Sequence, residues 1–159
     1  MIRKSTSSGL PSLLIASDHA GFELKEFLKQ SLSKKYVIVD LGPESDARTD
    51  YPDFAAKLSR RLQPLLHPKH GTPAKGVLIC GSGIGMCISA NKFRNIRAAV
   101  VESTKTAKLS KEHNDANVLC VGSRIVSKAK AKQIILAWLS AKFEGGRHLK
   151  RVQKIARLG

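Results

Sequence analysis

The 159-residue sequence has few cysteines, few aromatic residues and no long hydrophobic run. Its three cysteines, Cys80, Cys87 and Cys120, are odd in number and lack CxxC spacing, which argues against a disulfide framework or a zinc knuckle and favours a reducing compartment. No apolar run approaches the roughly 20 residues of a membrane-spanning helix. We therefore expect a cytoplasmic protein that makes no use of a membrane.

Acidic residues are scarce as well. The chain has 12 Asp and Glu against 28 Lys and Arg, a formal net charge of +16. More than half of this excess lies in residues 120–159, where Glu144 is the single acidic residue. A basic protein can bind nucleic acid or hold a small anion such as a phosphate. Aromatic residues make up only 5% of the chain, which leaves few platforms for stacking bases and disfavours nucleic acid.

Short apolar, β-branched runs alternate with segments of helical periodicity. The predicted strands are Leu13–Ala16, Tyr36–Leu41, Gly76–Cys80, Arg97–Val101 and Val118–Val121. Six helices are predicted. The first follows Gly21, the second begins near Pro52 and the third follows Gly85. The fourth spans about 104–111, the fifth carries the apolar series from Ala131 to Leu139, and the sixth spans about 147–157. This alternation predicts an α/β fold, with a buried parallel sheet covered by helices on both faces. Strand order is not predicted.

The domain organisation is simple. Residues 1–11 are polar and are expected to form a flexible N-terminal tail, and residues 12–159 a single domain. The stretch Gln63–Lys75, which is rich in Pro, His and Lys, is expected to be a surface loop.

The sequence Cys80-Gly81-Ser82-Gly83-Ile84-Gly85-Met86 follows the third predicted strand. Three glycines in five residues let successive backbone N–H groups point at one place, where they can bind an anion or a developing oxyanion. A dinucleotide fingerprint would need Gly in place of Met86, and a Walker motif would need Gly-Lys-Ser/Thr, so neither is present. Cys80 borders these amides, which favour its thiolate form, so it could act as a nucleophile or a general base. Cys87 and Cys120 lie in apolar sequence and are assigned to the core.

Two histidines are candidates for proton transfer or phosphate binding because they titrate near neutrality. His19 follows the first predicted strand, and His113 precedes the fifth; we take them to lie at neighbouring strand ends. Metal chelation by these histidines with Asp18 and Asp115 lacks the spacing of known metal motifs, so no metal site is predicted.

The last predicted helix carries a basic stripe that includes Arg147 and Arg151, one turn apart. Two guanidinium groups at this spacing can grip one phosphate with paired donors. Gly145 and Gly146 immediately before the helix would allow close approach to another surface.

Together, these segments resemble ribose-5-phosphate isomerase B, a sugar-phosphate isomerase family that also includes galactose-6-phosphate isomerase subunits. The resemblance covers about residues 12–157 in order. It is carried by Asp18-His19-Ala20-Gly21, Arg48-Thr49-Asp50-Tyr51-Pro52-Asp53, the Cys80–Met86 loop with Ala90-Asn91-Lys92, Ile96-Arg97-Ala98, His113-Asn114-Asp115-Ala116-Asn117-Val118, Gly122-Ser123-Arg124 and Phe143-Glu144-Gly145-Gly146-Arg147-His148.

The resemblance implies a Rossmann-like three-layer sandwich with a five-stranded parallel sheet, and a C-terminal helix that packs on a partner subunit. It implies aldose–ketose isomerisation of ribose 5-phosphate and ribulose 5-phosphate, a step of the non-oxidative pentose phosphate pathway, without metal or other cofactor. It further implies a homodimer whose sites draw on both subunits; whether dimers pair into tetramers is left open.

The resemblance also assigns the catalytic residues. Cys80 would be the base that moves a proton between C2 and C1; some members use a Glu where Met86 stands here, and Met cannot serve. His113 would open the furanose ring, with Asp18 helping to hold the sugar and the Ser82 hydroxyl assisting. The enediolate would be stabilised by backbone amides of Gly81, Gly83, Ile84 and Gly85.

Binding residues follow from the same resemblance. The phosphate would be held by His19, Arg124, Arg147 and Arg151, and Asn114 would contact the sugar. Arg124 and the His113-Asn114 pair are expected to come from the other subunit.

Two other functions stay open at this point. The first is isomerisation of a six-carbon phosphate such as galactose 6-phosphate or allose 6-phosphate. The second is a basic module that binds nucleic acid, which the sparse aromatic residues disfavour.

Overall fold

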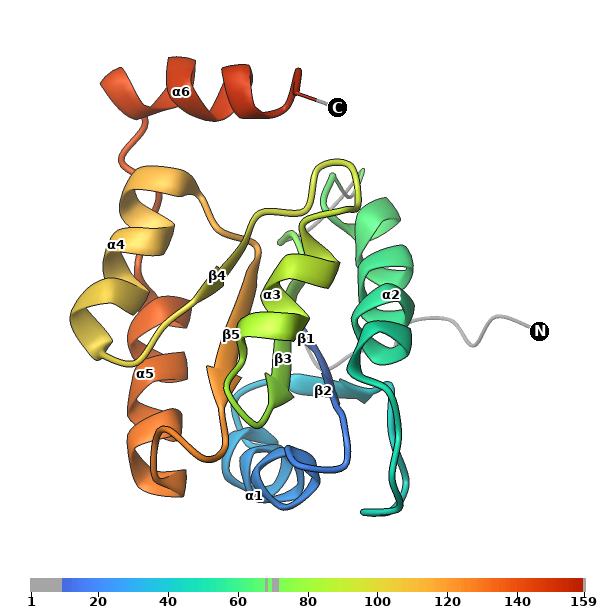
Figure 1. Ribbon diagram of the computed structural model, residues 1–159. Helices are drawn as coiled ribbons and strands as arrows, with labels where there is room; N and C mark the ends of the chain where they lie inside the picture. The colour runs from blue at the N-terminus through green and yellow to red at the C-terminus, as the bar shows by residue number, and fades with distance from the viewer. Residues whose placement is uncertain (1–9, 68, 70–71, 159) are drawn as a thin grey trace.

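A computed structural model describes residues 10–67, 69 and 72–158. In this part of the chain, five strands form one parallel sheet in the order β2-β1-β3-β5-β4 (Figure 1). The strands are β1 (Ser12–Ser17), β2 (Val37–Asp40), β3 (Lys75–Cys80), β4 (Ala98–Val100) and β5 (Val118–Gly122). The five predicted strands and the parallel sheet are confirmed. Residues 1–9 of the predicted tail lie outside the described residues.

The predicted helices are also confirmed. They are α1 (Phe22–Leu32), α2 (Tyr51–Leu62), α3 (Ile84–Ala90), α4 (Thr104–Asn114), α5 (Lys128–Ser140) and α6 (Arg147–Ile155). α3 begins at Ile84, one residue before Gly85, whereas the sequence predicted that it would begin after Gly85. α4 runs three residues past Lys111 and stops at Asp115, whose φ of 48° ends the helix. The predicted loop Gln63–Lys75 begins with a short 3-10 turn at Gln63–Leu65.

Alternating side chains of the sheet enter two separate cores. In β1, Leu13 and Ile15 face one core, whereas Leu14 and Ala16 face the other. The first core contains the apolar faces of α1, α4 and α5, including the fully buried Trp138 of α5. The second contains α2 and α3. The molecule is therefore a three-layer sandwich, which explains why the strands are apolar on both faces.

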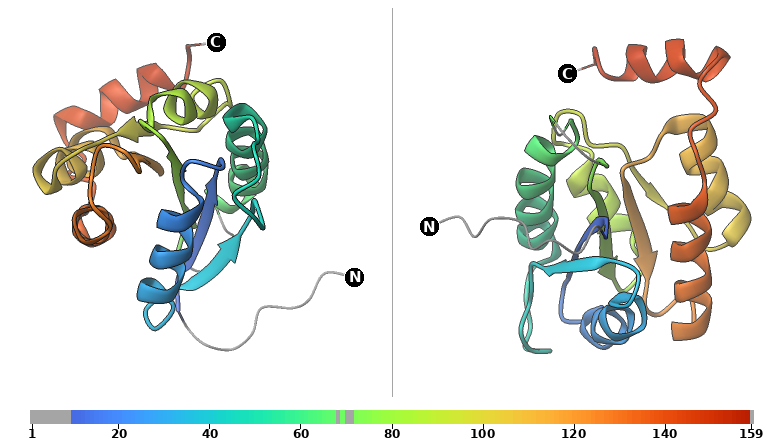
Figure 2. Two further views of the ribbon diagram at one scale, coloured as in Figure 1. Left: turned by 60° about the horizontal axis from the view of Figure 1, so that its bottom comes forward. Right: turned by 180° about the vertical axis from the view of Figure 1, so that it is seen from behind.

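The chain leaves β1 and β3 toward opposite faces of the sheet. The helix after β1 lies with α4 and α5, and the helix after β3 lies with α2 (Figures 1 and 2). In an open α/β sheet, the carboxyl ends of two such neighbouring strands border a crevice, which is the usual place for a ligand. The segments that enter this crevice are Asp18–Gly21 and Cys80–Gly85.

The last helix, α6, lies outside the three layers. It crosses the end of the molecule where the strands begin, and it contacts α4 (Figures 1 and 2). His148 and Val152 are its buried residues, whereas Leu149 and Ile155 are exposed. Packing of α6 on a partner subunit stays a prediction. None of the helices in the described part of the chain is long and apolar enough to cross a membrane.

Candidate active site

The carboxyl ends of β1, β3 and β5 are joined by hydrogen bonds between their loops. The N–H of Asp18 donates to the carbonyl of Ile79 over 3.1 Å, and the N–H of Ser123 donates to the carbonyl of Cys80 over 2.9 Å. The Ser123 hydroxyl also donates to the carbonyl of Ala20 over 2.7 Å. These bonds fix the three loops relative to one another, so side chains of distant sequence segments keep a defined geometry.

Cys80 is the last residue of β3 and is 5% exposed. Its Sγ accepts a hydrogen bond from the backbone N–H of Gly83 over 3.1 Å. An N–H donor stabilises a thiolate, so the contact supports the expected chemistry at this sulfur.

The loop reaches Cys80 because Gly83 has a φ of 79°. A Cβ at this position would lie 2.9 Å from the carbonyl carbon of Val121, so glycine is required by conformation and by space.

The rest of the glycine loop lies beside Ser82 and Tyr51. The Ser82 Oγ accepts a hydrogen bond from the N–H of Ile84 over 3.2 Å. A Cβ on Gly85 would lie 2.6 Å from the ring of Tyr51, so the absence of a side chain there lets the phenol approach the start of α3. Tyr51 is 40% exposed.

Asp18 and His19 are positioned on the other side of the crevice. The buried carboxylate of Asp18 accepts a hydrogen bond from the N–H of Gly21 over 3.0 Å. The N–H of His19 donates to the Thr49 Oγ1 over 3.2 Å, and the His19 Nδ1 lies 3.2 Å from the Thr49 carbonyl oxygen and 3.3 Å from its nitrogen. Since Thr49 occupies Nδ1, Nε2 is the ring nitrogen left to meet a ligand.

Arg124 also belongs to this edge of the sheet. Its N–H donates to the carbonyl of Gly81 over 3.0 Å, and its Nη1 lies 3.2 Å from the place where a Gly81 Cβ would be. Arg124 thus approaches the glycine loop of its own chain, which corrects the expectation that it comes from the other subunit. The reason is topological, because β5 lies next to β3 in the sheet.

His113 and Asn114 lie at the opposite edge. They end α4, which returns the chain to the start of β5, and the Arg97 Nε donates to the Asn114 carbonyl over 3.1 Å just before β4 begins. The interpretation that His113 and His19 occupy neighbouring strand ends is therefore wrong. A residue that precedes a parallel strand lies at the amino edge of the sheet, whereas a residue that follows one lies at the carboxyl edge.

Three side chains form a cluster at this amino edge. The rings of His113 and His148 stack with centroids 4.3 Å apart and planes 9° apart. The Glu144 Oε2 lies 3.5 Å from the His148 Nε2 and 3.9 Å from the His113 Nε2. Burial lowers the pKa of His148, and the neighbouring His113 and Arg147 lower it further against the opposing effect of Glu144.

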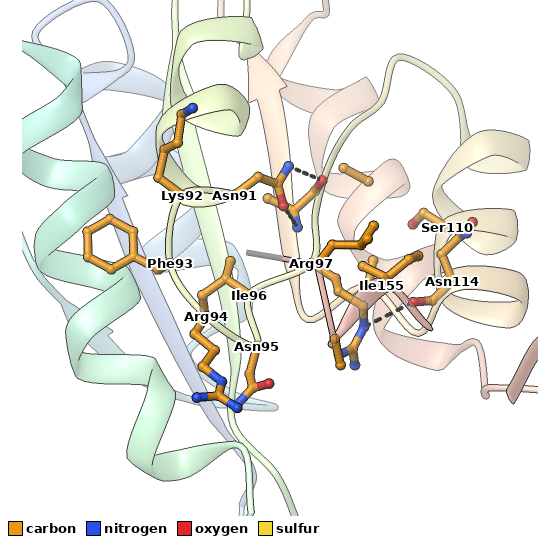
Figure 3. Close-up of a pocket in the computed structure, with 15 residues that line it drawn as sticks. Asn91, Lys92, Phe93, Arg94, Asn95, Ile96, Arg97, Ser110, Asn114 and Ile155 are labelled. Carbon is orange, nitrogen blue, oxygen red and sulfur yellow. Dashed lines mark hydrogen bonds between the residues drawn. The ribbon is translucent and has the colours of Figure 1, made fainter. Parts of the chain in front are cut away.

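Arg147 and Arg151 occupy the first turns of α6 near this cluster, and both are exposed. The Arg147 Nε lies 3.5 Å from the His148 Nε2. A cavity of about 610 Å³ opens nearby between the α3–β4 connection, the end of α4 and the end of α6; Asn114, Arg97 and Ile155 line it (Figure 3). Of the predicted substrate-binding residues at this edge, Asn114 thus lines a cavity, and Arg147 and Arg151 are exposed.

The predicted site residues form two sets in one chain. The carboxyl edge gathers Asp18, His19, Cys80, Gly81, Ser82, Gly83, Ile84, Gly85 and Arg124. The amino edge gathers His113, Asn114, Arg147 and Arg151. The six-residue strand β3 ends at the first set. At about 3.3 Å per residue, a strand of this length separates the edges by roughly 20 Å.

Within the described ranges, one group of side chains could hold a metal ion. It consists of His113, Glu144 and His148. The lone pair of an imidazole nitrogen lies in the ring plane, so two rings 9° from parallel direct their lone pairs side by side and not at one ion. Asp18 and His19 lie at the other edge of the sheet from His113 and Asp115, so those four residues do not form a ligand set.

The two remaining cysteines differ from one another. Cys120 is fully buried, as predicted, and burial raises the pKa of its thiol well above the usual value. Cys87 is half-buried on α3, and hydrogen bonding with Cys120 lowers its pKa to about 7 against the opposing effect of burial. The Cys87 Sγ lies 3.3 Å from the Ala98 carbonyl oxygen of β4. Since it is held against this edge strand, Cys87 is not a competitor for the role of Cys80.

Four residues of the two clusters were not singled out as site residues from the sequence. Thr49 and Tyr51 were quoted only as part of the resemblance. Glu144 was also noted as the single acidic residue of residues 120–159, and His148 was expected to be a structural histidine. Glu144 and His148 are four residues apart, but Glu144 precedes α6 and is separated from it by the positive φ of Gly145 and Gly146, so helical spacing does not link them. No spacing rule links His148 to His113, because their contact depends on how α6 crosses α4.

A family model described as ribose/galactose isomerase matches residues 13–155. The probable ribose-5-phosphate isomerase B of Mycoplasma genitalium is 44% identical over 148 residues, which cover 92% of this chain and 94% of that protein. Ribose-5-phosphate isomerase B of Escherichia coli is 43% identical over 147 residues, 92% of this chain and 95% of that protein. The solved structure of the M. genitalium enzyme with bound ribulose-5-phosphate has a TM-score of 0.84 and 44% identity, and covers 92% of this chain and 94% of that one.

Proposed function

The chain belongs to the ribose/galactose isomerase family, and we propose that it interconverts D-ribose 5-phosphate and D-ribulose 5-phosphate through an enediolate, with Cys80 as the base. The contact that carries this proposal is the hydrogen bond from the Gly83 N–H to the Cys80 Sγ, at the crevice between β1 and β3. A base there needs to remove a proton from C2 of the aldose and return it to C1.

The first step opens the furanose ring. The C1–O4 bond breaks as O4 gains a proton from His113, and the 1-hydroxyl gives its proton to a water molecule, so that C1 becomes an aldehyde. Asp18, whose carboxylate is fixed by the Gly21 N–H, orients the sugar hydroxyls. General acid catalysis of this kind contributes about 10²–10⁴-fold when the acid is well placed.

The second step moves the proton. The Cys80 thiolate takes the C2 proton, the electron pair moves into the C1–C2 bond, and O1 becomes an oxyanion near the glycine loop. Two backbone amides of the loop already donate hydrogen bonds. The Gly83 N–H donates to the Cys80 Sγ, and the Ile84 N–H donates to the Ser82 Oγ. On binding, the substrate oxyanion replaces Ser82 as the acceptor for the Ile84 amide, and the freed hydroxyl exchanges protons with the sugar oxygens. One oxyanion donor is worth roughly 3–4 kcal/mol in comparable sites.

The proposed active unit is a homodimer, because one chain keeps its acid and its base on opposite edges of the sheet. A second copy that presents its amino edge to the crevice would add its own His113, Asn114, Arg147 and Arg151 there. Exposed apolar side chains near α3 and β4 fit such an interface. They are Ile84, Ile88, Val100 and Ile125, which are 40–60% exposed.

The decisive assay measures ribose 5-phosphate conversion with EDTA present, for wild type and two cysteine variants. Cys80→Ala is expected to lose nearly all turnover, whereas Cys87→Ser, the matched control on the next helix, is expected to keep it. Near wild-type turnover by Cys80→Ala would show that Cys80 is not the base.

The family description also includes galactose, so a six-carbon phosphate is the alternative substrate. The relatives from Mycoplasma genitalium and Escherichia coli are both named for the five-carbon reaction, which favours ribose 5-phosphate. Comparison of kcat/KM for ribose 5-phosphate, allose 6-phosphate and galactose 6-phosphate decides between them.

A further inference from the structure

The buried histidine of α6 touches the residue to which we assign ring opening. His148 is 6% exposed, whereas the side chain of His113 is 37% exposed. Their rings lie 4.3 Å apart and within 9° of parallel, so one face of the His113 imidazole is covered by a ring that is itself held in the protein.

The backbone fixes His148 against the helix that carries His113. The N–H of Glu144 donates to the Glu112 carbonyl over 3.0 Å, which ties the segment before α6 to the last turn of α4. The N–H of His148 donates to the Gly145 carbonyl over 2.9 Å. One carboxylate lies beside both rings: the Glu144 Oε2 is 3.5 Å from the His148 Nε2 and 3.9 Å from the His113 Nε2.

We propose that His148 is a positioning residue for the reaction: it fixes the plane of the His113 imidazole by stacking, so that His113 meets the furanose oxygen in the geometry that ring opening requires. This inference rests on the proposed function. The lowered pKa of His148 agrees with the role, since a neutral ring offers an uncharged face and does not replace His113 as the proton donor.

The inference predicts an effect on ring opening alone. His148 has no part in the C2 proton transfer, which occurs at Cys80. His148 also adjoins Arg147, so loss of the His148 side chain would weaken binding of the substrate phosphate if the role of His148 were only to hold Arg147. A purely structural role would therefore raise KM, whereas a positioning role lowers the rate of ring opening at saturating substrate.

The test isolates ring opening in the Cys80→Ala protein, which lacks the base. Exchange between the α and β anomers of ribose 5-phosphate passes through the open aldehyde, so exchange NMR at saturating substrate measures this step without isomerisation. We expect the Cys80→Ala protein to accelerate the exchange relative to the rate without protein. Adding His148→Ala to this protein is expected to slow the accelerated exchange about tenfold or more, since small misplacements of a reacting group cost up to about 10²-fold. His148→Phe keeps the stack and is expected to restore the rate to within about twofold.

The inference is overturned if exchange is unchanged by His148→Ala, if the loss lies in KM alone, or if His148→Phe is as slow as His148→Ala. If Cys80→Ala itself gives no acceleration, the ring-opening role and this inference fall together. The wild-type assay on ribose 5-phosphate is independent of these results, so failure of the isomerase proposal is recognised separately.

Discussion

Two inactive variants are expected to restore activity to each other when their subunits mix. In the proposed dimer, each site takes Cys80 from one chain and His113 from the other. A mixed dimer of Cys80→Ala and His113→Asn chains therefore has one site with both residues intact and one site with neither. Random mixing makes half of the dimers mixed, and half of their sites are intact, so we expect about a quarter of wild-type activity.

The assay is turnover of ribose 5-phosphate after co-expression of the two variants with different affinity tags. Purification through both tags isolates the mixed dimer, for which the expected activity rises to about half of wild type. Each variant alone provides the baseline. Full inactivity of the isolated mixed dimer would refute the division of the site between two chains, because that dimer would contain a complete set of residues.

A matched control follows from the place of Arg124 in the structure. Arg124 lies against Gly81 of its own chain, at the same edge as Cys80. Mixed dimers of Cys80→Ala and Arg124→Ala therefore carry a defect in both sites, and kcat/KM is expected to stay low. Restoration in this pair would mean that Arg124 acts across the interface, contrary to the geometry of the chain.

Three further predictions concern single residues. Gly83→Ala is expected to lower the free energy of unfolding by about 1–3 kcal/mol, measured by denaturant titration, because Gly83 has a φ of 79° and no room for a Cβ. Arg151→Lys is expected to raise KM for ribose 5-phosphate about tenfold with little change in kcat, since lysine lacks paired planar donors. Burial would raise the pKa of Asp40, but hydrogen bonds from Lys25 and Lys29 outweigh it and lower this pKa from 3.8. The resulting stability is present above pH 3.8 and is lost as the pH falls through the lowered pKa, and Asp40→Asn is expected to flatten this acid dependence of unfolding.

The sequence predicted the fold well because local patterns determine it. Strands such as Gly76–Cys80 are continuous apolar runs, and the series from Ala131 to Leu139 repeats with helical spacing. The glycine loop was also predictable, since its backbone geometry depends on residues that adjoin Cys80. The contact of His148 with His113 was not, because it depends on the angle at which α6 leaves Gly145 and Gly146, whose φ values of 66° and 52° follow from no apolar pattern.

The division of the site could have been derived from chain order alone. In a parallel sheet, a residue that follows its strand lies at one edge, and a residue that precedes its strand lies at the other. Cys80 is the last residue of the strand Lys75–Cys80, and His113 precedes the strand Val118–Gly122, so these two side chains lie about one strand length apart. A five-carbon sugar phosphate is too short to touch both within one chain. If both residues act on one substrate, the topology requires a second copy of the chain, whatever family the sequence resembles.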